Sequence, residues 1–182
     1  MFLSLQGVQA NRRTPHHAVE AYLRKAATPY TFLRPNFFMQ NLSTYAKEIR
    51  DRGEIFAPAG RSHTAFIDAR DIGAVAVFTS AGHDRKAYTL SGEQSLTYQA
   101  VARIMTDVLR RPIRYTRPSE QSYLAALAEQ GAPQDNIDVQ KMIYRVVRLN
   151  ISAFPNHAVQ KLIGRPATRF DQFVDDYRDV WS

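Results

Sequence analysis

The apolar pattern of the first forty residues predicts a strand, a helix and a second strand. Residues 2–5 form a short apolar run, and a polar loop over 7–13 follows. Thr14 and Pro15 are residue types favoured where a helix begins, and that helix should reach about Ala26. A strand–helix–strand unit predicts two parallel strands joined by a right-handed crossover.

The second of these strands has the composition of a strand buried on both faces. Residues 30–33, Tyr-Thr-Phe-Leu, are aromatic, β-branched or apolar and show no alternation with polar residues. Pro35 has no N–H to donate, so the strand should end at about Arg34. The residues that come next would then lie at the carboxyl end of a parallel strand, where open α/β sheets bind their ligands.

The rest of the chain predicts short strands among longer helices, with a helical carboxy-terminal part. We expect Asn41 or Ser43 to cap a helix that Gly53 ends, and Asp71 to cap an apolar helix over 72–80. The other expected elements are strands at 54–57, 64–67, 86–90 and 113–115, and helices over 97–109, 120–130, 133–150 and 170–181. In the last of these helices an apolar stripe from Phe170 to Trp181 predicts docking on the core.

The segment after residue 35 is the first candidate for a binding site. Asn36 carries an amide between the buried strand and three large apolar residues, Phe37, Phe38 and Met39. An amide beside aromatic rings can orient a flat ligand. The alternative is an aromatic core cluster beneath a helix, which composition alone favours.

Composition and charge narrow the classes of function. The 182 residues, 45% of them hydrophobic, suffice for a globular domain with a real core, and the lack of cysteine excludes disulfides and thiolate metal sites. No apolar run approaches the roughly 18 residues of a membrane span, so we expect a cytoplasmic protein.

The formal net charge is +7, and the basic residues are scattered along the chain. Their densest group is Lys141, Arg145 and Arg148. Without a nucleic-acid-binding motif beside it, this group is better read as a solvated helix face than as a nucleic-acid surface.

Several segments in order resemble the NmrA-like proteins, which are atypical relatives of the short-chain dehydrogenases and include NAD(P)H-dependent quinone reductases and redox-sensing regulators. The segments are PHHAVEAYLRKAATPYTFLRPNFFMQNL, GEIFAPAG, AFIDARDIGAVA, KAYTLSGEQSLTYQAVA and KLIGRPATRFDQFVDDY. The resemblance implies an α/β fold with a Rossmann-like parallel sheet over residues 1–90. A smaller, mainly helical substrate lobe over 91–182 would complete a single domain. It further implies NADP(H) or NAD(H) as cofactor and hydride transfer to a quinone or small carbonyl acceptor. A non-catalytic sensor of cofactor redox state is the alternative.

The resemblance also implies roles for individual residues. Ser4 and Gly7 match the strand-end segment that lines the cofactor. Asn36, Phe37 and Phe38 would bind the nicotinamide and a flat acceptor.

His16 and Glu20 match a His-x-x-x-Glu pair beside the nicotinamide, so they are the candidate catalytic residues. His16 would orient a carbonyl or relay a proton while Glu20 holds its tautomer. The alternative is a helix-capping histidine and an exposed salt bridge. Tyr22 and Lys25 approximate the Tyr-x-x-x-Lys dyad of short-chain dehydrogenases with the lysine one residue early, so we assign Tyr22 to the apolar stripe of its helix. We expect no metal site.

The sequence departs from the family pattern in its glycines. No G-x-G-x-x-G or G-x-x-G-x-x-G occurs in it. Ala27 stands where relatives usually have a glycine, and an alanine at that position would strain a left-handed helix cap. We therefore expect the carboxy-terminal portion of such a protein, with fewer than six parallel strands. Its binding of NADP(H) should be no better than about millimolar, and its apolar sheet edge should favour self-association.

Overall fold

The computed structural model describes residues 1–26 and 28–182, so the expected strain at Ala27 lies outside the described residues. The chain forms two compact units, each built from three segments. One comprises residues 1–40, 65–94 and 155–169, and the other residues 41–64, 95–154 and 170–182. The two units therefore alternate along the sequence.

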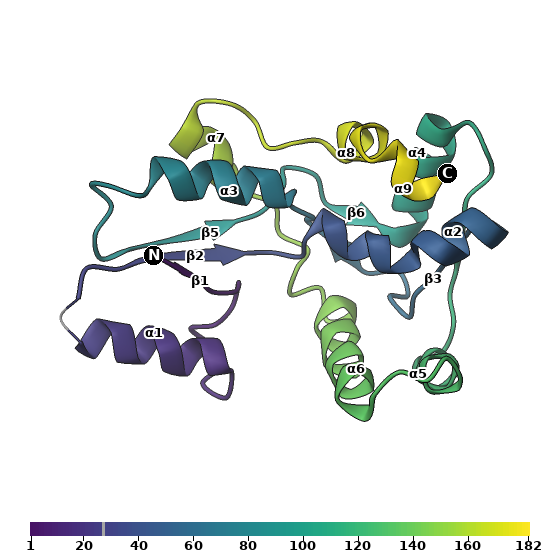
Figure 1. Ribbon diagram of the computed structural model, residues 1–182, viewed down its shortest axis with the longest axis horizontal. Coiled ribbons are helices and arrows are strands. Elements are labelled where there is room, and N and C mark those ends of the chain that lie inside the picture. Colours follow the sequence, from purple (N-terminus) through teal and green to yellow (C-terminus); the bar gives the residue numbers. More distant parts are fainter. Residues whose placement is uncertain (27) are drawn as a thin grey trace. The chain divides into compact units, whose positions relative to one another are not determined.

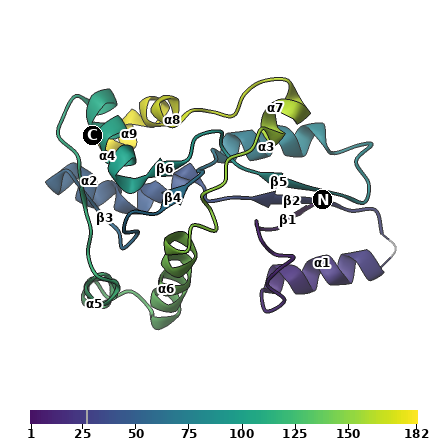
Figure 2. The ribbon, with the colours of Figure 1, turned by 180° about the vertical axis from the view of Figure 1, so that it is seen from behind.

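The first unit is a parallel sheet with helices on both faces (Figures 1 and 2). Its elements are β1 (Phe2–Leu3), α1 (Pro15–Lys25), β2 (Thr31–Pro35), α3 (Ala69–Phe78), β5 (Lys86–Leu90) and α7 (Ala158–Ile163). The strand order is β1-β2-β5, and both pairings are parallel, with Phe2 opposite Phe32 and Thr31 opposite Lys86. The predicted α/β fold with a parallel sheet is confirmed, and this sheet has three strands in the described part of the chain.

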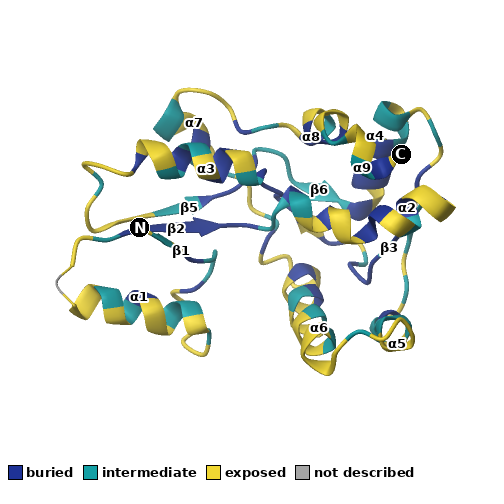
Figure 3. Cartoon of the chain, in the orientation of Figure 1, coloured by how far each residue is buried: buried dark blue, intermediate teal, exposed yellow. Residues whose placement is uncertain are grey.

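Strand β2 is buried along its whole length, as its composition predicts (Figure 3). Phe32 lies on the side of α1, where it contacts Phe2, Tyr30 and the guanidinium of Arg24. Leu33 belongs to the opposite side, in a cluster with Val75 of α3 and Val159 of α7. The absence of hydrophobic–polar alternation therefore has a direct cause, since both faces of the strand meet helices. The strand includes Pro35, which pairs with Leu90 of β5, and the Pro35 carbonyl accepts the Gln6 N–H at 3.0 Å.

Helix α1 begins as predicted but buries an unexpected face. The Thr14 hydroxyl caps the helix by accepting the His17 N–H, and Pro15 is its first residue. Tyr22, however, is 70% exposed, so its assignment to a buried apolar stripe is wrong, and Val19 on the same helix is also 38% exposed. The buried residue of α1 is Glu20.

Glu20 turns inward because β2 carries a buried cation. Arg34 donates from Nε to Oε1 of Glu20 at 2.9 Å and from Nη2 to Oε2 at 2.6 Å, and Arg24 adds a third bond at 3.0 Å. The side chains of Glu20 and Arg34 are 2% and 9% exposed. Burial alone would raise the pKa of Glu20, but the hydrogen bonds from Arg34, the nearby Ser4 hydroxyl and the charges of Arg34 and Arg24 bring that pKa below its usual value. This bidentate pair fixes α1 on the sheet.

The second unit is mainly helical. Its elements are α2 (Ala46–Arg52), β3 (Glu54–Phe56), β4 (His63–Thr64), β6 (Leu96–Thr97), α4 (Tyr98–Leu109), β7 (Arg114–Thr116), α5 (Glu120–Glu129), α6 (Gln134–Arg148), α8 (Phe170–Asp176) and α9 (Arg178–Trp181). Strands β3 and β7 pair parallel, whereas β4 and β6 pair antiparallel. The unit's core includes Phe170, Phe173 and Trp181, so the predicted docking of the carboxy-terminal stripe is confirmed, with the helix divided at Tyr177.

Two local predictions are wrong for identifiable reasons. A 3₁₀ helix, η1 (Met39–Tyr45), precedes α2, so the first residue outside α2 is Tyr45 rather than Asn41 or Ser43. The expected strand over 64–67 stops at Thr64, and Ile67 instead forms an isolated parallel bridge with Phe38. Gly53 does end α2, in the left-handed conformation. None of the described helices is long and apolar enough to cross a membrane.

The close approach of two loops makes Gly92 a specific requirement. A Cβ at Gly92 would lie 2.0 Å from the carbonyl oxygen of Phe66, which is a backbone atom and cannot turn away. We expect Gly92→Ala to lower the free energy of unfolding by about 2 kcal/mol. The matched control is Gly73→Ala within α3, where a Cβ meets nothing within 4 Å and helix propensity predicts no loss. Urea denaturation measures both, and equal midpoints for the two variants would contradict the steric argument.

The buried ion pair predicts an acid-sensitive contribution to stability. A carboxylate with a lowered pKa in the folded state stabilises the protein above its unfolded pKa, and that stability is lost as the pH falls through the folded pKa. Glu20→Gln leaves Arg34 buried without its anion, so we expect a loss of about 3 kcal/mol at pH 7 that shrinks as the pH is lowered below about 4. Glu129→Gln, an exposed change of the same type, should leave the urea midpoint unchanged at both pH values. A Glu20→Gln penalty independent of pH would rule out the ion pair as its source.

Candidate functional site

The carboxyl ends of β1, β2 and β5 meet at one edge of the sheet, where the candidate residues Ser4 and Asn36 directly follow β1 and β2. Ser4 continues β1 by donating its N–H to the Leu33 carbonyl at 2.7 Å. Asn36 continues β2 in the same way, toward the Leu90 carbonyl at 2.8 Å. The pairing of the strands therefore holds the backbone of both candidate residues in register.

Asn36 shapes the turn that leaves the central strand. Its side chain is buried, and its Oδ1 accepts the N–H of Phe37 at 2.8 Å. The Phe37 ring packs edge-on against Phe66 at 5.8 Å between centroids, whereas Phe38 packs against the core cluster around Leu33. Both rings are half-buried and Met39 is fully buried. Met39 therefore belongs to the core, as the core-cluster interpretation predicts. Phe37 and Phe38 are each partly exposed, as residues of a binding segment would be.

Ser4 and Gly7 lie at the end of the neighbouring strand. The Ser4 side chain is buried beside the Glu20 carboxylate, close enough to lower its pKa although the two groups are not aligned for a regular hydrogen bond. Gly7 has a φ of 79°, and a Cβ there would meet nothing within 4 Å. The backbone conformation therefore requires glycine, and the space beside it is open.

His16 and Glu20 have different surroundings although they lie one helical turn apart. The His16 ring, which is partly exposed, lies 6.1 Å from the ring of Phe2. Glu20 contacts Arg34, Arg24 and Ser4. Glu20 does form a salt bridge, as the alternative to a catalytic role predicts. Its main partner, Arg34, is buried, however, so this salt bridge is not an exposed one. A catalytic role for His16 stays a prediction.

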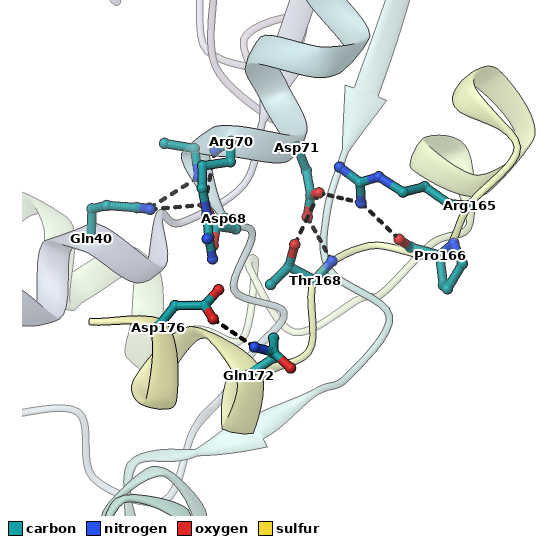
Figure 4. Close-up of polar contacts among 10 residues, drawn as sticks. Gln40, Asp68, Arg70, Asp71, Arg165, Pro166, Thr168, Gln172 and Asp176 are labelled. Carbon is teal, nitrogen blue, oxygen red and sulfur yellow. Dashed lines mark hydrogen bonds and ion pairs between the residues drawn. The ribbon is translucent and has the colours of Figure 1, made fainter. Parts of the chain in front are cut away.

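A polar network at the start of α3 was not anticipated from the sequence (Figure 4). Gln40, directly after the Phe-Phe-Met segment, donates to Oδ1 of Asp68 at 2.9 Å and accepts the Ala69 N–H at 3.0 Å. Asp68 in turn caps α3 by accepting the Arg70 N–H at 2.8 Å, so the assignment of the cap to Asp71 is wrong. Burial of Asp68 opposes ionisation, but hydrogen bonds from Arg70 and Gln40 lower its pKa.

Asp71 has a different task, because it binds a segment almost a hundred residues away. Its carboxylate is fully buried and accepts from Arg165 Nη1 at 2.7 Å, from the Thr168 N–H at 2.7 Å and from the Thr168 hydroxyl at 3.1 Å. Glu93, just past β5, accepts the Ala167 N–H at 3.2 Å. In the sequence, only the Asp-x-x-Asp spacing from Asp68 to Asp71 could have indicated this role. If Asp68 is the cap, Asp71 lies in the first turn of the helix and is free to bind another segment.

A hydroxyl, an amide and two aromatic rings therefore follow neighbouring parallel strands at one edge. This combination suits a flat, polar heteroaromatic ring, which needs stacking surfaces and a few oriented hydrogen bonds. The turn after β2 is fixed by Gln40 and Asp68, which join this segment to the start of α3.

Known proteins are similar to this chain in sequence. The model of the NmrA-like family matches residues 14–164. An NAD(P)H azoreductase from Xenophilus azovorans is 36% identical over 154 residues, which are 84% of this chain and 54% of that protein. Quinone oxidoreductase 2 of Escherichia coli is 26% identical over 173 residues, or 91% of this chain and 58% of that protein.

The fold is shared with solved structures as well. The NADPH complex of an NADPH-dependent quinone oxidoreductase from Escherichia coli superposes with a TM-score of 0.84 at 25% identity, covering 96% of this chain and 63% of that one. The chain spans about half the length of the curated relatives that it matches. With most of its residues matched by the family model and its sheet matched by these structures, the chain belongs to the NmrA-like family.

Proposed function

We propose that this chain forms the nicotinamide and acceptor end of an NAD(P)H-dependent reductase whose acceptor is a quinone or another small conjugated carbonyl compound. The observation that carries the proposal is the position of Asn36, Phe37 and Phe38 directly after the central parallel strand, beside Ser4. The relatives named as an NAD(P)H azoreductase and a quinone oxidoreductase support the same class of reaction. When bound, the reduced nicotinamide supplies a hydride, and the acceptor gains that hydride and one proton.

Each residue of the site has a role that its surroundings allow. The half-buried rings of Phe37 and Phe38 supply apolar surface for a flat acceptor, and Asn36 orients the ring-bound carbonyl or amide. The open space at Gly7 lets a ligand approach the backbone. His16, partly exposed on α1, is the proton donor of the proposal, and water can replace it because reduction of a quinone needs no strong acid.

Glu20 is a positioning residue in this proposal rather than a catalytic acid. Arg34 binds both of its carboxylate oxygens, and its pKa is lowered, so it stays ionised at neutral pH. An ionised, ion-paired carboxylate cannot donate a proton. It can hold the end of β1, with Ser4, in place against α1.

The non-catalytic alternative uses the same groups, because a sensor of cofactor redox state must also bind the nicotinamide. Turnover separates the two functions, since a sensor binds cofactor but does not reduce a quinone at a useful rate. The experiments below therefore measure binding and turnover on the same preparations.

The first experiment compares two cofactor probes. Because the sequence contains no glycine-rich phosphate turn, we expect NADPH and reduced nicotinamide mononucleotide to bind the 182-residue chain with dissociation constants within about three-fold of each other, both near millimolar. Nuclear magnetic resonance titration should show the largest amide shifts at Ser4 and at 36–38. Micromolar binding of NADPH alone would show that other residues of the chain hold its phosphates.

The second experiment removes the amide donor of Asn36. Asn36→Asp keeps the oxygen that accepts the Phe37 N–H, so the turn has its internal bond, but it replaces the NH₂ group. We expect kcat/KM for NADPH-dependent quinone reduction to fall at least roughly ten-fold, the equivalent of one lost hydrogen bond. The control is Asn41→Asp, the same change at an exposed position, which should keep full activity.

Circular dichroism of both variants tests that the fold is retained. An unchanged kcat/KM in a folded Asn36→Asp protein would refute the assignment of the site. Cofactor binding that weakens in this variant, with no turnover in the parent chain, would favour the sensor alternative.

A further inference from the structure

The net charge of the chain is concentrated in its first unit. That unit contains eleven Lys and Arg residues and five Asp and Glu residues, which give it a formal charge of +6. The second unit contains thirteen and twelve, so its formal charge is +1. A surface with an excess of one sign of charge attracts ions of the opposite sign. An anionic ligand is therefore drawn to the unit that carries the candidate site.

Three buried carboxylates of the first unit already have cations of their own. The ion pairs are Glu20 with Arg34, Asp68 with Arg70, and Asp71 with Arg165. Figure 4 shows the last two of them. Because each of these arginines neutralises a carboxylate of the same unit, the positive charge that a ligand can use must come from other residues.

Arg12 and Arg13, here called the arginine pair, have no such partner. Both are exposed, and within the described part of the chain neither guanidinium group meets a carboxylate or a hydrogen-bond acceptor. They lie next to each other in the loop over 7–13, which contains no acidic residue. Neighbouring like charges repel, so an anion that binds both lowers their electrostatic energy. The planar donors of a guanidinium group suit an anion with paired oxygens.

The loop over 7–13 begins and ends at the edge where the candidate site lies. Just before it, the Gln6 N–H donates to the carbonyl of Pro35, the residue that precedes Asn36, at 3.0 Å. Its other end is Thr14, the cap of α1, and α1 starts at the end of the sheet toward which β1 and β2 run (Figure 1). The arginine pair therefore lies at the same end of the sheet as the candidate residues.

Contacts with α1 and turns of its own hold this loop in place. Val8 is fully buried, and its carbonyl accepts from Nδ1 of His17 at 3.1 Å. Successive turns join the Ala10 N–H to the Gly7 carbonyl at 3.0 Å and the Asn11 N–H to the Val8 carbonyl at 3.3 Å. A loop bound in this way presents its charged side chains from a fixed backbone.

We propose that the arginine pair binds an anionic substituent of the acceptor, so that the chain reduces sulfonated or carboxylated quinones in preference to neutral ones. The inference rests on the proposed function and names the substrate class of the same site. The substituent takes no part in the reaction. The quinone gains a hydride from the reduced nicotinamide and one proton from His16 or water to become a hydroquinone, and its sulfonate or carboxylate group is unchanged.

The test compares two naphthoquinones on charge variants of the full 182-residue chain. Arg12→Gln/Arg13→Gln removes the arginine pair. The control Lys25→Gln/Lys86→Gln has the same net charge but removes two exposed cations at the opposite end of the sheet, where α1 ends and β5 begins.

The KM values at a fixed, saturating concentration of NADPH are the main measurement. We expect the arginine variant to raise KM for 1,4-naphthoquinone-2-sulfonate about ten-fold while kcat is unchanged, because it loses binding of a group that does not react. Its KM for the neutral 2-methyl-1,4-naphthoquinone should stay the same, which also shows that the variant is folded. The lysine control should change neither KM.

Ionic strength gives a second measurement. Between roughly 0.05 M and 1 M sodium chloride the Debye length falls to about 3 Å, so screening should remove most of the preference for the sulfonated quinone. The arginine variant should show little salt dependence of this preference, because it lacks the charges that salt screens.

Binding measured without turnover separates this inference from the proposed function. Nuclear magnetic resonance titration with 1,4-naphthoquinone-2-sulfonate gives its dissociation constant for each variant. If the parent chain reduces neither quinone but binds the sulfonate about ten-fold more tightly than the arginine variant, the proposed function fails and the arginine assignment stands.

Three results would overturn the inference and leave the proposed function intact. They are equal changes of KM for the two quinones, equal effects of the arginine and lysine variants, and a sulfonate that binds parent and arginine variant alike. The cofactor phosphates are a second source of anionic groups. A rise in KM for NADPH in the arginine variant, with both quinones and no change in the KM of the sulfonate, would assign the pair to those phosphates and refute its role toward the acceptor.

Discussion

The first unit depends on a cation that its central strand carries into the interior. Arg34 lies on β2, whose residues are all buried, and its guanidinium cannot stay there without an anion. Glu20 provides that anion from α1 through two parallel hydrogen bonds, with Arg24 on its outer side. The orientation of α1 follows from this pair, since its buried residue is a carboxylate while Tyr22 and Val19 are exposed. Ser4, at the end of β1, is held beside the same carboxylate, so the ion pair reaches the edge where the candidate site lies.

That edge is assembled from segments that are far apart in the chain. The turn after β2 is joined to the start of α3 by Gln40 and Asp68, and the loop after β5 passes so close to Phe66 that it requires Gly92. The segment before α8 is bound by Asp71 and Glu93. Several of these contacts use carboxylates with little or no exposure, for which hydrogen-bonded partners are essential. The half-buried rings of Phe37 and Phe38 are therefore presented by a rigid support rather than by an independent loop.

The two units differ in the part that they play in the function proposed for this chain. In the first unit an amide, a hydroxyl and aromatic rings follow the carboxyl ends of neighbouring parallel strands, which is where the proposed nicotinamide and flat acceptor would bind. In the second unit the core holds one face of α6 and leaves the other, apolar face exposed. The candidate ligand site thus lies in the first unit.

Local sequence determined the elements whose causes are local. The double burial of β2 followed from the run of aromatic, β-branched and apolar residues at 30–33, and the cap at Thr14 followed from its hydroxyl. The end of α2 followed from Gly53, and the docking of the last helices from the Phe170–Trp181 stripe. The family, and with it the place of Asn36, Phe37 and Phe38 past a parallel strand, could also be predicted from the sequence.

Tertiary structure alone decided the partners of buried charges. The sequence pattern places Glu20 on the polar face of its helix, whereas the ion pair with the buried Arg34 holds it in the interior. Asp71 looked like a helix cap, but Arg165 and Thr168 gave it a different role. Such pairs join residues 14 to 97 positions apart, and no local pattern encodes which charge a folded chain will bring within 3 Å of another.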